Sequence, residues 1–305
     1  MGREIEGLVS DVASAGRVGD RERFGAATAV LRVRLLAQRT GSSIGPKMAF
    51  GTLRPAGDAV GKALVEAPLQ EALACIDLMA HDESAEIRSI ACQCLARVGV
   101  IHPEAIVPLA RHLAADSSWE VREFIANALD EVMGQDQGDF VYQVMRQWVH
   151  DPDPNVRRVP TNALMRYGRR YPDRIIALMK ELLHDDSRYV RDNVVFCLGV
   201  MGAIKVQAIG SASDPDNPQR LLAALRQWIE DDNEHTRWII AKTLGRSWAK
   251  SCGQDAMAML DILSADERRG VRQAVASSIK ALQASAPGLV RTATVGMALP
   301  DKPAP

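Results

Sequence analysis

Trp119 and Glu123 are the residues whose types and spacing most strongly suggest chemistry. They lie four residues apart in WEVRE (119–123), so a helix would place both side chains on one face. An indole ring can hold a cationic group against its face, and a carboxylate can stabilise positive charge that develops during a reaction. The alternative is a solvated helix face without chemistry. The choice depends on the elements that position the pair.

A repeated segment supplies those elements. Six segments share one pattern, in which an Asp is followed by five residues and then an Arg. The residue directly before the Arg is aliphatic or Thr. The arginines lie 34 or 35 residues apart, except for one interval of 46 that contains the Gly/Ser/Pro-rich residues 203–219. This periodicity predicts stacked repeats with one inserted loop. We name the six residues the ladder arginines: Arg88, Arg122, Arg157, Arg191, Arg237 and Arg272.

Each repeat is expected to form two helices. Apolar residues follow each ladder arginine at helical spacing, as in Val121, Ile125 and Leu129, and a second helical segment precedes each Asp. The Asp is expected to cap the second helix and to meet the arginine two turns on. This pattern resembles the HEAT-repeat family over residues 65–283. The resemblance implies an all-α solenoid of about six repeats with a concave inner face.

The second helices are expected to line that inner face, and four of them are basic. The helices expected at 154–170, 187–200, 234–250 and 267–282 together carry +12, although the chain carries −1. The ladder arginines account for part of this charge, because each has an aspartate. The remaining charge predicts contact with a phosphate backbone. Pro160 is expected to kink the helix at 154–170.

The flanks of the repeat array are less regular. Residues 1–64 are expected to form an N-terminal helical cap or degenerate repeat, with a helix at 26–38 and a loop or degenerate repeat at 41–55. Residues 284–305 lack periodicity and are rich in Ala, Pro and Gly, so they are expected to be disordered.

Short motifs resemble a bacterial family, the HEAT-like DNA alkylation-repair glycosylases. That family carries a Trp followed four residues later by an acid, as WEVRE does, and an Arg-Arg pair in the next repeat, as VRR (156–158) does. AFGTLR (49–54), EIRSIACQCL (86–95) and NEHTRWIIAKTLGRSWAK (233–250) are similar to other segments of the family. The acid here is Glu123, where one major branch has Asp. That branch also has a Trp where Ala241 aligns here, and Trp238 lies one turn earlier.

The resemblance implies a DNA glycosylase that binds double-stranded DNA and excises N-alkylated purines. A carboxylate near the sugar would stabilise the oxocarbenium-like state in which the glycosidic bond breaks. Glu123 would be this catalytic carboxylate, and the residues that hold the base would be Trp119, Trp238 and Asp192. The residues that contact DNA phosphates would be Arg158, Arg188, Arg166 and Lys242.

Composition and missing motifs exclude several other classes. No apolar run is long enough to cross a membrane, the first residues lack a secretory signal, and five cysteines are expected as thiols in a reducing cytoplasm. No metal site or cofactor-binding motif is present, so neither a metal nor a cofactor is expected. The prediction is a cytoplasmic monomer. The alternative function is a non-catalytic HEAT-repeat scaffold that binds protein or DNA structure.

Overall fold

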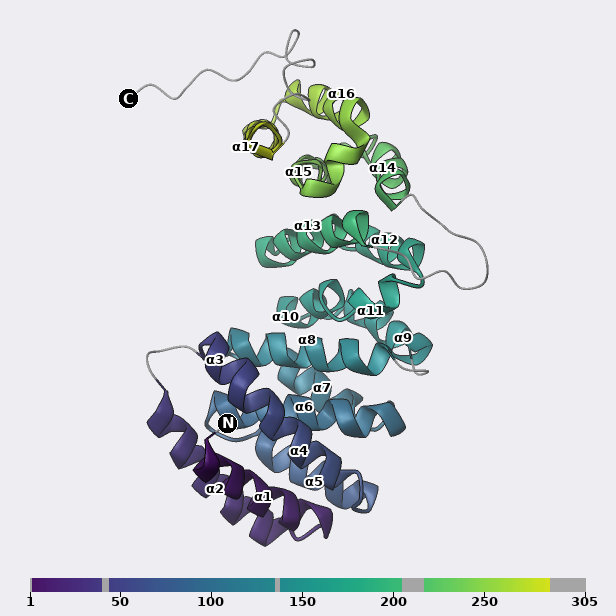
Figure 1. The fold of residues 1–305 in the computed structure, drawn as a ribbon. Helices are drawn as coiled ribbons and strands as arrows, with labels where there is room; N and C mark the ends of the chain where they lie inside the picture. The colour runs from purple at the N-terminus through teal and green to yellow at the C-terminus, as the bar shows by residue number, and fades with distance from the viewer. Residues whose placement is uncertain (1, 40–43, 135–137, 205–216, 286–305) are drawn as a thin grey trace. The chain divides into compact units, whose positions relative to one another are not determined.

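The structure is a computed structural model of the 305-residue chain, and it describes residues 2–39, 44–134, 138–204 and 217–285. All regular secondary structure in these ranges is helical, and the chain is an all-α solenoid (Figure 1). The chain divides into two compact units, residues 1–163 and 164–305. The boundary expected at residue 64 lies inside the first unit, where α4 packs against both α1 and α6.

The first unit consists of paired helices that follow the predicted repeats. Two short segments with other helical geometries interrupt them, the π-helical η1 (Ala49–Leu53) and the 3-10 helical η2 (Val159–Thr161). The α-helices are α1 (Arg3–Arg17), α2 (Arg21–Gln38), α3 (Pro46–Met48), α4 (Arg54–Leu64), α5 (Leu69–Ala80), α6 (Ala85–Ile101), α7 (Val107–Ala114), α8 (Trp119–Met133), α9 (Gly138–Trp148) and α10 (Pro154–Arg158).

The second unit continues the same pattern. The second helix of each repeat packs beside the second helix of the next one, as α13 does against α15 and α15 against α17. The 3-10 helix η3 (Ser247–Cys252) joins α15 to α16. The α-helices are α11 (Met165–Gly168), α12 (Pro172–Lys180), α13 (Arg188–Ala203), α14 (Asn217–Trp228), α15 (Glu234–Leu244), α16 (Gly253–Ser264) and α17 (Arg269–Ser285).

The predicted helical spacing identifies the core correctly. Val121, Ile125 and Leu129 are buried on α8, and the tryptophans at the ends of α9 and α14, Trp148 and Trp228, are buried as well. All five cysteines are buried thiols. Apolar burial between consecutive repeats therefore stabilises the stack, as expected for helix pairs that have no separate core of their own.

The ladder arginines and the aspartates six residues before them stabilise the turns between paired helices. We call these aspartates the ladder aspartates: Asp82, Asp116, Asp151, Asp185, Asp231 and Asp266. The carboxylate of each ladder aspartate accepts the N–H two residues further on, at 2.7–2.9 Å. The following arginine donates to the backbone carbonyl of that aspartate, at 2.6–3.2 Å. Arg88 and Arg237 also pair with a carboxylate of the next repeat, Asp116 and Asp266 respectively, and Arg237 lies 3.3 Å from Asp232 of its own repeat. The residue that caps the second helix lies two positions after the aspartate, as Ser84 does.

One expectation for local structure requires correction, and one alternative is resolved. The helix expected over 154–170 is not merely kinked but broken, because α10 ends at Arg158 and η2, which contains Pro160, follows it. Of the two alternatives for 41–55, a loop or a degenerate repeat, the helical one fits from Pro46 onward, where the chain runs through α3 and η1 into α4. The inserted residues 205–216 and the tail from residue 286 lie outside the described residues.

Two glycines on α4 allow this helix to lie close to α6. A Cβ atom on Gly57 would lie 2.5 Å from the Cβ of Gln93, and one on Gly61 would lie 2.9 Å from the Cγ of Arg97. Contacts this short do not occur between real side chains, so both positions require glycine. The close approach brings the polar residues of α4 and α6 onto one surface beside α8.

Candidate binding cavity in the first unit

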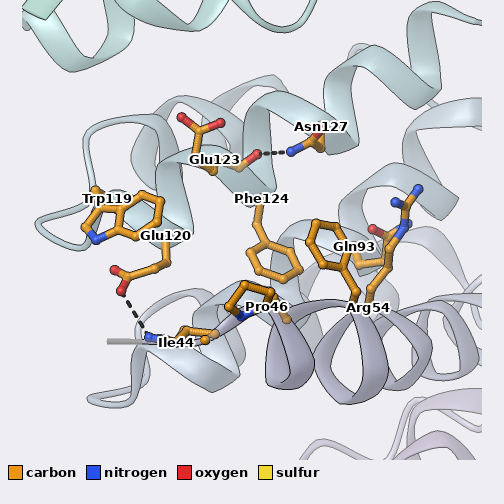
Figure 2. A pocket seen from close by; sticks show the side chains of 12 residues that line it. Ile44, Pro46, Arg54, Gln93, Trp119, Glu120, Glu123, Phe124 and Asn127 are labelled. Carbon is orange, nitrogen blue, oxygen red and sulfur yellow. Dashed lines mark hydrogen bonds between the residues drawn. The ribbon is translucent and has the colours of Figure 1, made fainter. Parts of the chain in front are cut away.

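A cavity of about 410 Å³ lies between α8 and the segment that begins at Ile44. It brings together residues from α3, η1, α4, α6 and α8, which are far apart in the sequence (Figure 2). Its lining contains both residues of the WEVRE pair and three residues of AFGTLR. The lining residues are Ile44, Gly45, Pro46, Ala49, Phe50, Arg54, Gln93, Trp119, Glu120, Glu123, Phe124 and Asn127.

Aromatic side chains form much of the apolar part of the cavity. Trp119 is the first residue of α8 and is 54% exposed, while Phe50 on η1 is 68% exposed. Phe124 points from α8 toward Pro46 (Figure 2). Large aromatic side chains are rarely left this exposed without a partner, and π-helical turns are frequent at functional sites. The cavity therefore offers aromatic surface to a ligand.

Glu123 is held in place at the edge of this cavity. Its Oε1 accepts a hydrogen bond from Nη1 of Arg158 at 2.6 Å and a second one from Nη2. Nδ2 of Asn162 lies 3.2 Å from Oε2 and 3.4 Å from Oε1. The Glu123 side chain remains 36% exposed. The carboxylate is thus both accessible and fixed by two side chains of the next repeat, as a preorganised site requires.

Arg158 has a different position from the one that we expected. Its side chain is only 1% exposed, and its guanidinium is bound to Glu123. A phosphate contact requires donors at the surface, so Arg158 is not presented to phosphate in this structure. Its burial makes it a residue that positions the Glu123 carboxylate. The VRR motif therefore matters through this ion pair rather than through an exposed arginine pair.

Glu120 forms the link between α8 and the opposite wall of the cavity. It accepts the N–H of Ile44 at 3.1 Å and the hydroxyl of Ser118 at 2.6 Å. Burial alone would raise the pKa of Glu120. The hydrogen bonds from Ser118, from its own backbone N–H and from Ile44, together with the charge of Arg39, outweigh burial and lower it. Glu120 therefore binds the wall as an ionised carboxylate.

The remaining predicted site residues lie in the second unit. Arg188 and Asp192 are one turn apart on α13 and form an ion pair of 3.6 Å, with both side chains exposed. The Arg188 guanidinium lies 5.7 Å from the ring centre of Trp238 on α15. Arg166 is exposed on α11, and Lys242 on α15 lies 3.3 Å from the Ser277 hydroxyl. Arg188, Asp192 and Trp238 therefore form a cluster of their own.

Sequence reasoning did not assign Phe50, Arg54, Glu120 or Phe124 to the site. Phe50 and Arg54 belong to AFGTLR, a motif that carried the resemblance, yet their approach to α8 depends on the path of α3 and η1, which the sequence left open. Gln93 and Asn127 could have been found, because each lies five residues after a ladder arginine. That shared position in the repeat predicts that they lie on one surface.

Two possible features of other protein classes are not found in the described ranges. Within residues 2–39, 44–134, 138–204 and 217–285, no three His, Cys, Asp or Glu side chains gather as a metal site would require. Every helix in these ranges is too short or too polar to cross a lipid bilayer.

Residues 72–146 and 177–280 match the family model for HEAT repeats. Among curated proteins, no sequence matches the chain. Similar solved structures include an engineered protein with 15% identity, which covers 95% of this chain and 86% of its own at a TM-score of 0.33. A Kap121p mutant has 11% identity, with coverage of 87% and 30% and a TM-score of 0.39. A designed armadillo repeat protein, in complex with the peptide (KR)4, has 16% identity, with coverage of 91% and 99% and a TM-score of 0.28.

Proposed function

Since the chain belongs to the HEAT-repeat family, whose stacked helices place side chains of successive repeats side by side, we propose that its cavity binds the base of an N-alkylated purine in duplex DNA. Glu123 then assists cleavage of the glycosidic bond of that base. The observation that carries this proposal is the cavity itself, because it unites Trp119 and Glu123 with the AFGTLR segment. Both motifs belong to the resemblance to alkylation-repair glycosylases.

The charge of the cavity suits a cationic base. Two carboxylates, Glu120 and Glu123, line it near Trp119, while Arg54 lines the other end. A purine alkylated on a ring nitrogen carries a positive charge, so the end with the carboxylates attracts it more strongly than an ordinary neutral base. The exposed ring of Trp119 adds a cation–π contact, which contributes about 0.5–2 kcal/mol.

The geometry around Glu123 suits stabilisation of an oxocarbenium-like sugar. Breaking the glycosidic bond releases a neutral purine and leaves positive charge on the sugar. Water then adds to the anomeric carbon of the sugar and loses a proton to the solvent. A carboxylate that Arg158 and Asn162 already hold needs little reorganisation as this charge develops. Glu123 is therefore the proposed catalytic residue, and Arg158 is a positioning residue.

The predicted roles of the second unit remain part of this proposal. Arg188, Arg166 and Lys242 are at least partly exposed, which a contact with DNA phosphate requires. Trp238 and Asp192 are proposed to contact bound DNA. Arg188 lies over the Trp238 ring, so a base that stacks on this ring must first displace the guanidinium.

A base-release assay with Glu123→Gln tests the proposal. The substitution keeps the shape of the side chain and removes its charge, so release of 3-methyladenine or 7-methylguanine from methylated duplex should fall about 100-fold. Duplex affinity should stay constant or rise slightly, because a negative charge near phosphates is lost. Glu22→Gln, at an exposed position on α2, is the matched control and should retain the wild-type rate. Equal release by wild type and Glu123→Gln would contradict the role of Glu123.

The second candidate is a non-catalytic scaffold whose cavity holds a cationic side chain of a protein partner. The exposed rings of Trp119 and Phe50 favour it, because aromatic faces also hold a lysine or arginine side chain through cation–π contact. The HEAT-repeat match is equally compatible with this function. Wild-type protein that neither binds duplex DNA at low salt nor releases methylated purines would favour the scaffold.

A further inference from the structure

Three cations form a second charged group beside the cavity, at the end opposite Trp119. Arg54 and Lys62 lie two turns apart on α4, and Arg97 lies on α6. Their side chains are 43%, 66% and 37% exposed, respectively. Arg54 also lines the cavity, where Figure 2 shows it far from Trp119 and close to Gln93. We call Arg54, Lys62 and Arg97 the cationic cluster.

Two carboxylates hold the cationic cluster together without neutralising it. Asp58 lies between Arg54 and Lys62 on α4 and pairs with Lys62 at 2.7 Å and with Arg97. Glu131 on α8 pairs with Arg54 and accepts a hydrogen bond from the Gln93 amide at 2.9 Å. Burial alone would raise the pKa of Asp58, but Lys62 and Arg97 outweigh it and lower the pKa. Three cations against two carboxylates leave a formal net charge of +1.

We infer that the cationic cluster binds phosphate groups of the DNA strand whose base enters the cavity, an inference that rests on the proposed function. The cavity then has two ends of opposite character. Trp119 and Glu123 hold the cationic base, while Arg54, Lys62 and Arg97 contact the strand next to it. A nucleotide with an alkylated purine carries the complementary charges, with a cation on the base and an anion on the phosphate.

Phosphate fits this cluster better than a single carboxylate group does. A phosphodiester group presents several oxygen acceptors, and an arginine fork binds two of them at once. Arg54 and Arg97 are both held by carboxylates, so little side-chain entropy is lost when they bind. The surface also extends along α4 for two helical turns, which suits a strand better than a compact anion.

The salt dependence of duplex binding by the full chain tests the inference. Each phosphate contact that is lost lowers the magnitude of the slope of log K against log salt by about 0.9. Arg54→Gln and Lys62→Gln should each lower it by nearly one unit, and the double variant by nearly two. Arg23→Gln on α2 and Lys180→Gln on α12 remove the same charges from exposed positions elsewhere and should leave the slope unchanged.

Glu131→Gln supplies a test with the opposite sign. Removing this carboxylate raises the net charge of the cluster, so duplex affinity at low salt should rise about two- to fivefold, the effect of roughly one exposed charge pair. A purely structural role for Glu131 would lower or preserve affinity. Circular dichroism and thermal melting confirm that each variant is folded before its affinity is compared.

The two failures can be told apart. If wild type binds duplex DNA and Arg54→Gln has the same slope as Arg23→Gln, the phosphate inference is wrong while the proposed function stands. If wild type does not bind duplex DNA at low salt, the proposed function and the inference that rests on it are both overturned.

Discussion

The same position in the repeat has opposite character in the two units. On α8 the residues three before and one after the ladder arginine are Trp119 and Glu123, and on α13 they are Arg188 and Asp192. Glu123 is fixed by Arg158, which is 1% exposed, whereas Asp192 pairs at 3.6 Å with an arginine whose side chain is 76% exposed. The first unit thus has a buried positioning residue and the second has a surface ion pair.

This comparison shows that repeat register alone does not create a site. Register determines which positions share a surface, and the burial of the partner determines whether a side chain is held in place. A surface ion pair contributes little and exchanges readily with solvent, while a buried arginine imposes one geometry on its carboxylate. We therefore expect substitutions in the first unit to have larger effects than their counterparts in the second.

The largest expected effect is on stability. Arg158→Met removes a buried guanidinium and leaves Glu123 without its main partner, so the free energy of unfolding should fall by about 2–4 kcal/mol. Arg188→Met removes an exposed ion pair and should change it by less than about 0.5 kcal/mol. Urea denaturation of both variants measures the difference. Equal losses in the two variants would show that burial of the arginine does not determine its contribution to stability.

A smaller effect on the free energy of unfolding is expected when either of two carboxylates with a lowered pKa is replaced. One of them, Glu120, lies in the first unit and the other, Asp266, in the second. Hydrogen bonds from Arg268 and Arg237 hold the pKa of Asp266 well below its usual value, against the effect of burial. The pKa of Glu120 is lowered by the hydrogen bonds described above. A lowered pKa stabilises the fold in full above the unfolded values of about 3.9 for Asp and 4.3 for Glu. This stabilisation is lost as the pH falls through the lower folded value.

Asp266→Asn and Glu120→Gln should therefore each destabilise the protein at pH 7, by on the order of 1–2 kcal/mol, with the larger loss for Asp266→Asn. Both losses should shrink when urea denaturation is repeated at pH 3. The exposed Asp261→Asn serves as a control and should change the free energy of unfolding by less than about 0.5 kcal/mol. A loss that does not depend on pH would show that these carboxylates do not act through their charge.

The smallest expected effect concerns the two tryptophans and ligand affinity. Trp119→Ala should weaken binding of a duplex that contains an alkylated purine about five- to tenfold, because about 1 kcal/mol of cation–π contact is lost. Trp238→Ala should weaken it less, since Arg188 already occupies one face of that ring. Fluorescence titrations with alkylated and unmodified duplexes separate lesion recognition from general binding. A larger effect of Trp238→Ala would transfer the lesion contact to the second unit.

Much of the fold could be predicted from residue patterns. The spacing of the ladder residues gave the repeats, and the apolar periodicity gave buried positions such as Ile125 and Leu129. The partners of the ladder arginines could not be predicted. A guanidinium can donate to a carboxylate or to a carbonyl oxygen, and the sequence does not show which of them lies within reach. The sequence left a loop or a degenerate repeat open for 41–55, since Gly and Pro residues favour a loop in isolation while the segment lies next to the repeats.

Local periodicity identifies the HEAT repeats, the all-helical class and the helix face that Trp119 and Glu123 share. It does not show that Arg158 is buried against Glu123 or that Phe50 and Arg54 reach α8 from a distant segment. These contacts form between repeats, and local periodicity does not specify how closely the repeats pack. The burial of Arg158 depends on the end of α10 just before Pro160. The approach of α4 to α6 depends on Gly57, which has no side chain to keep the two helices apart.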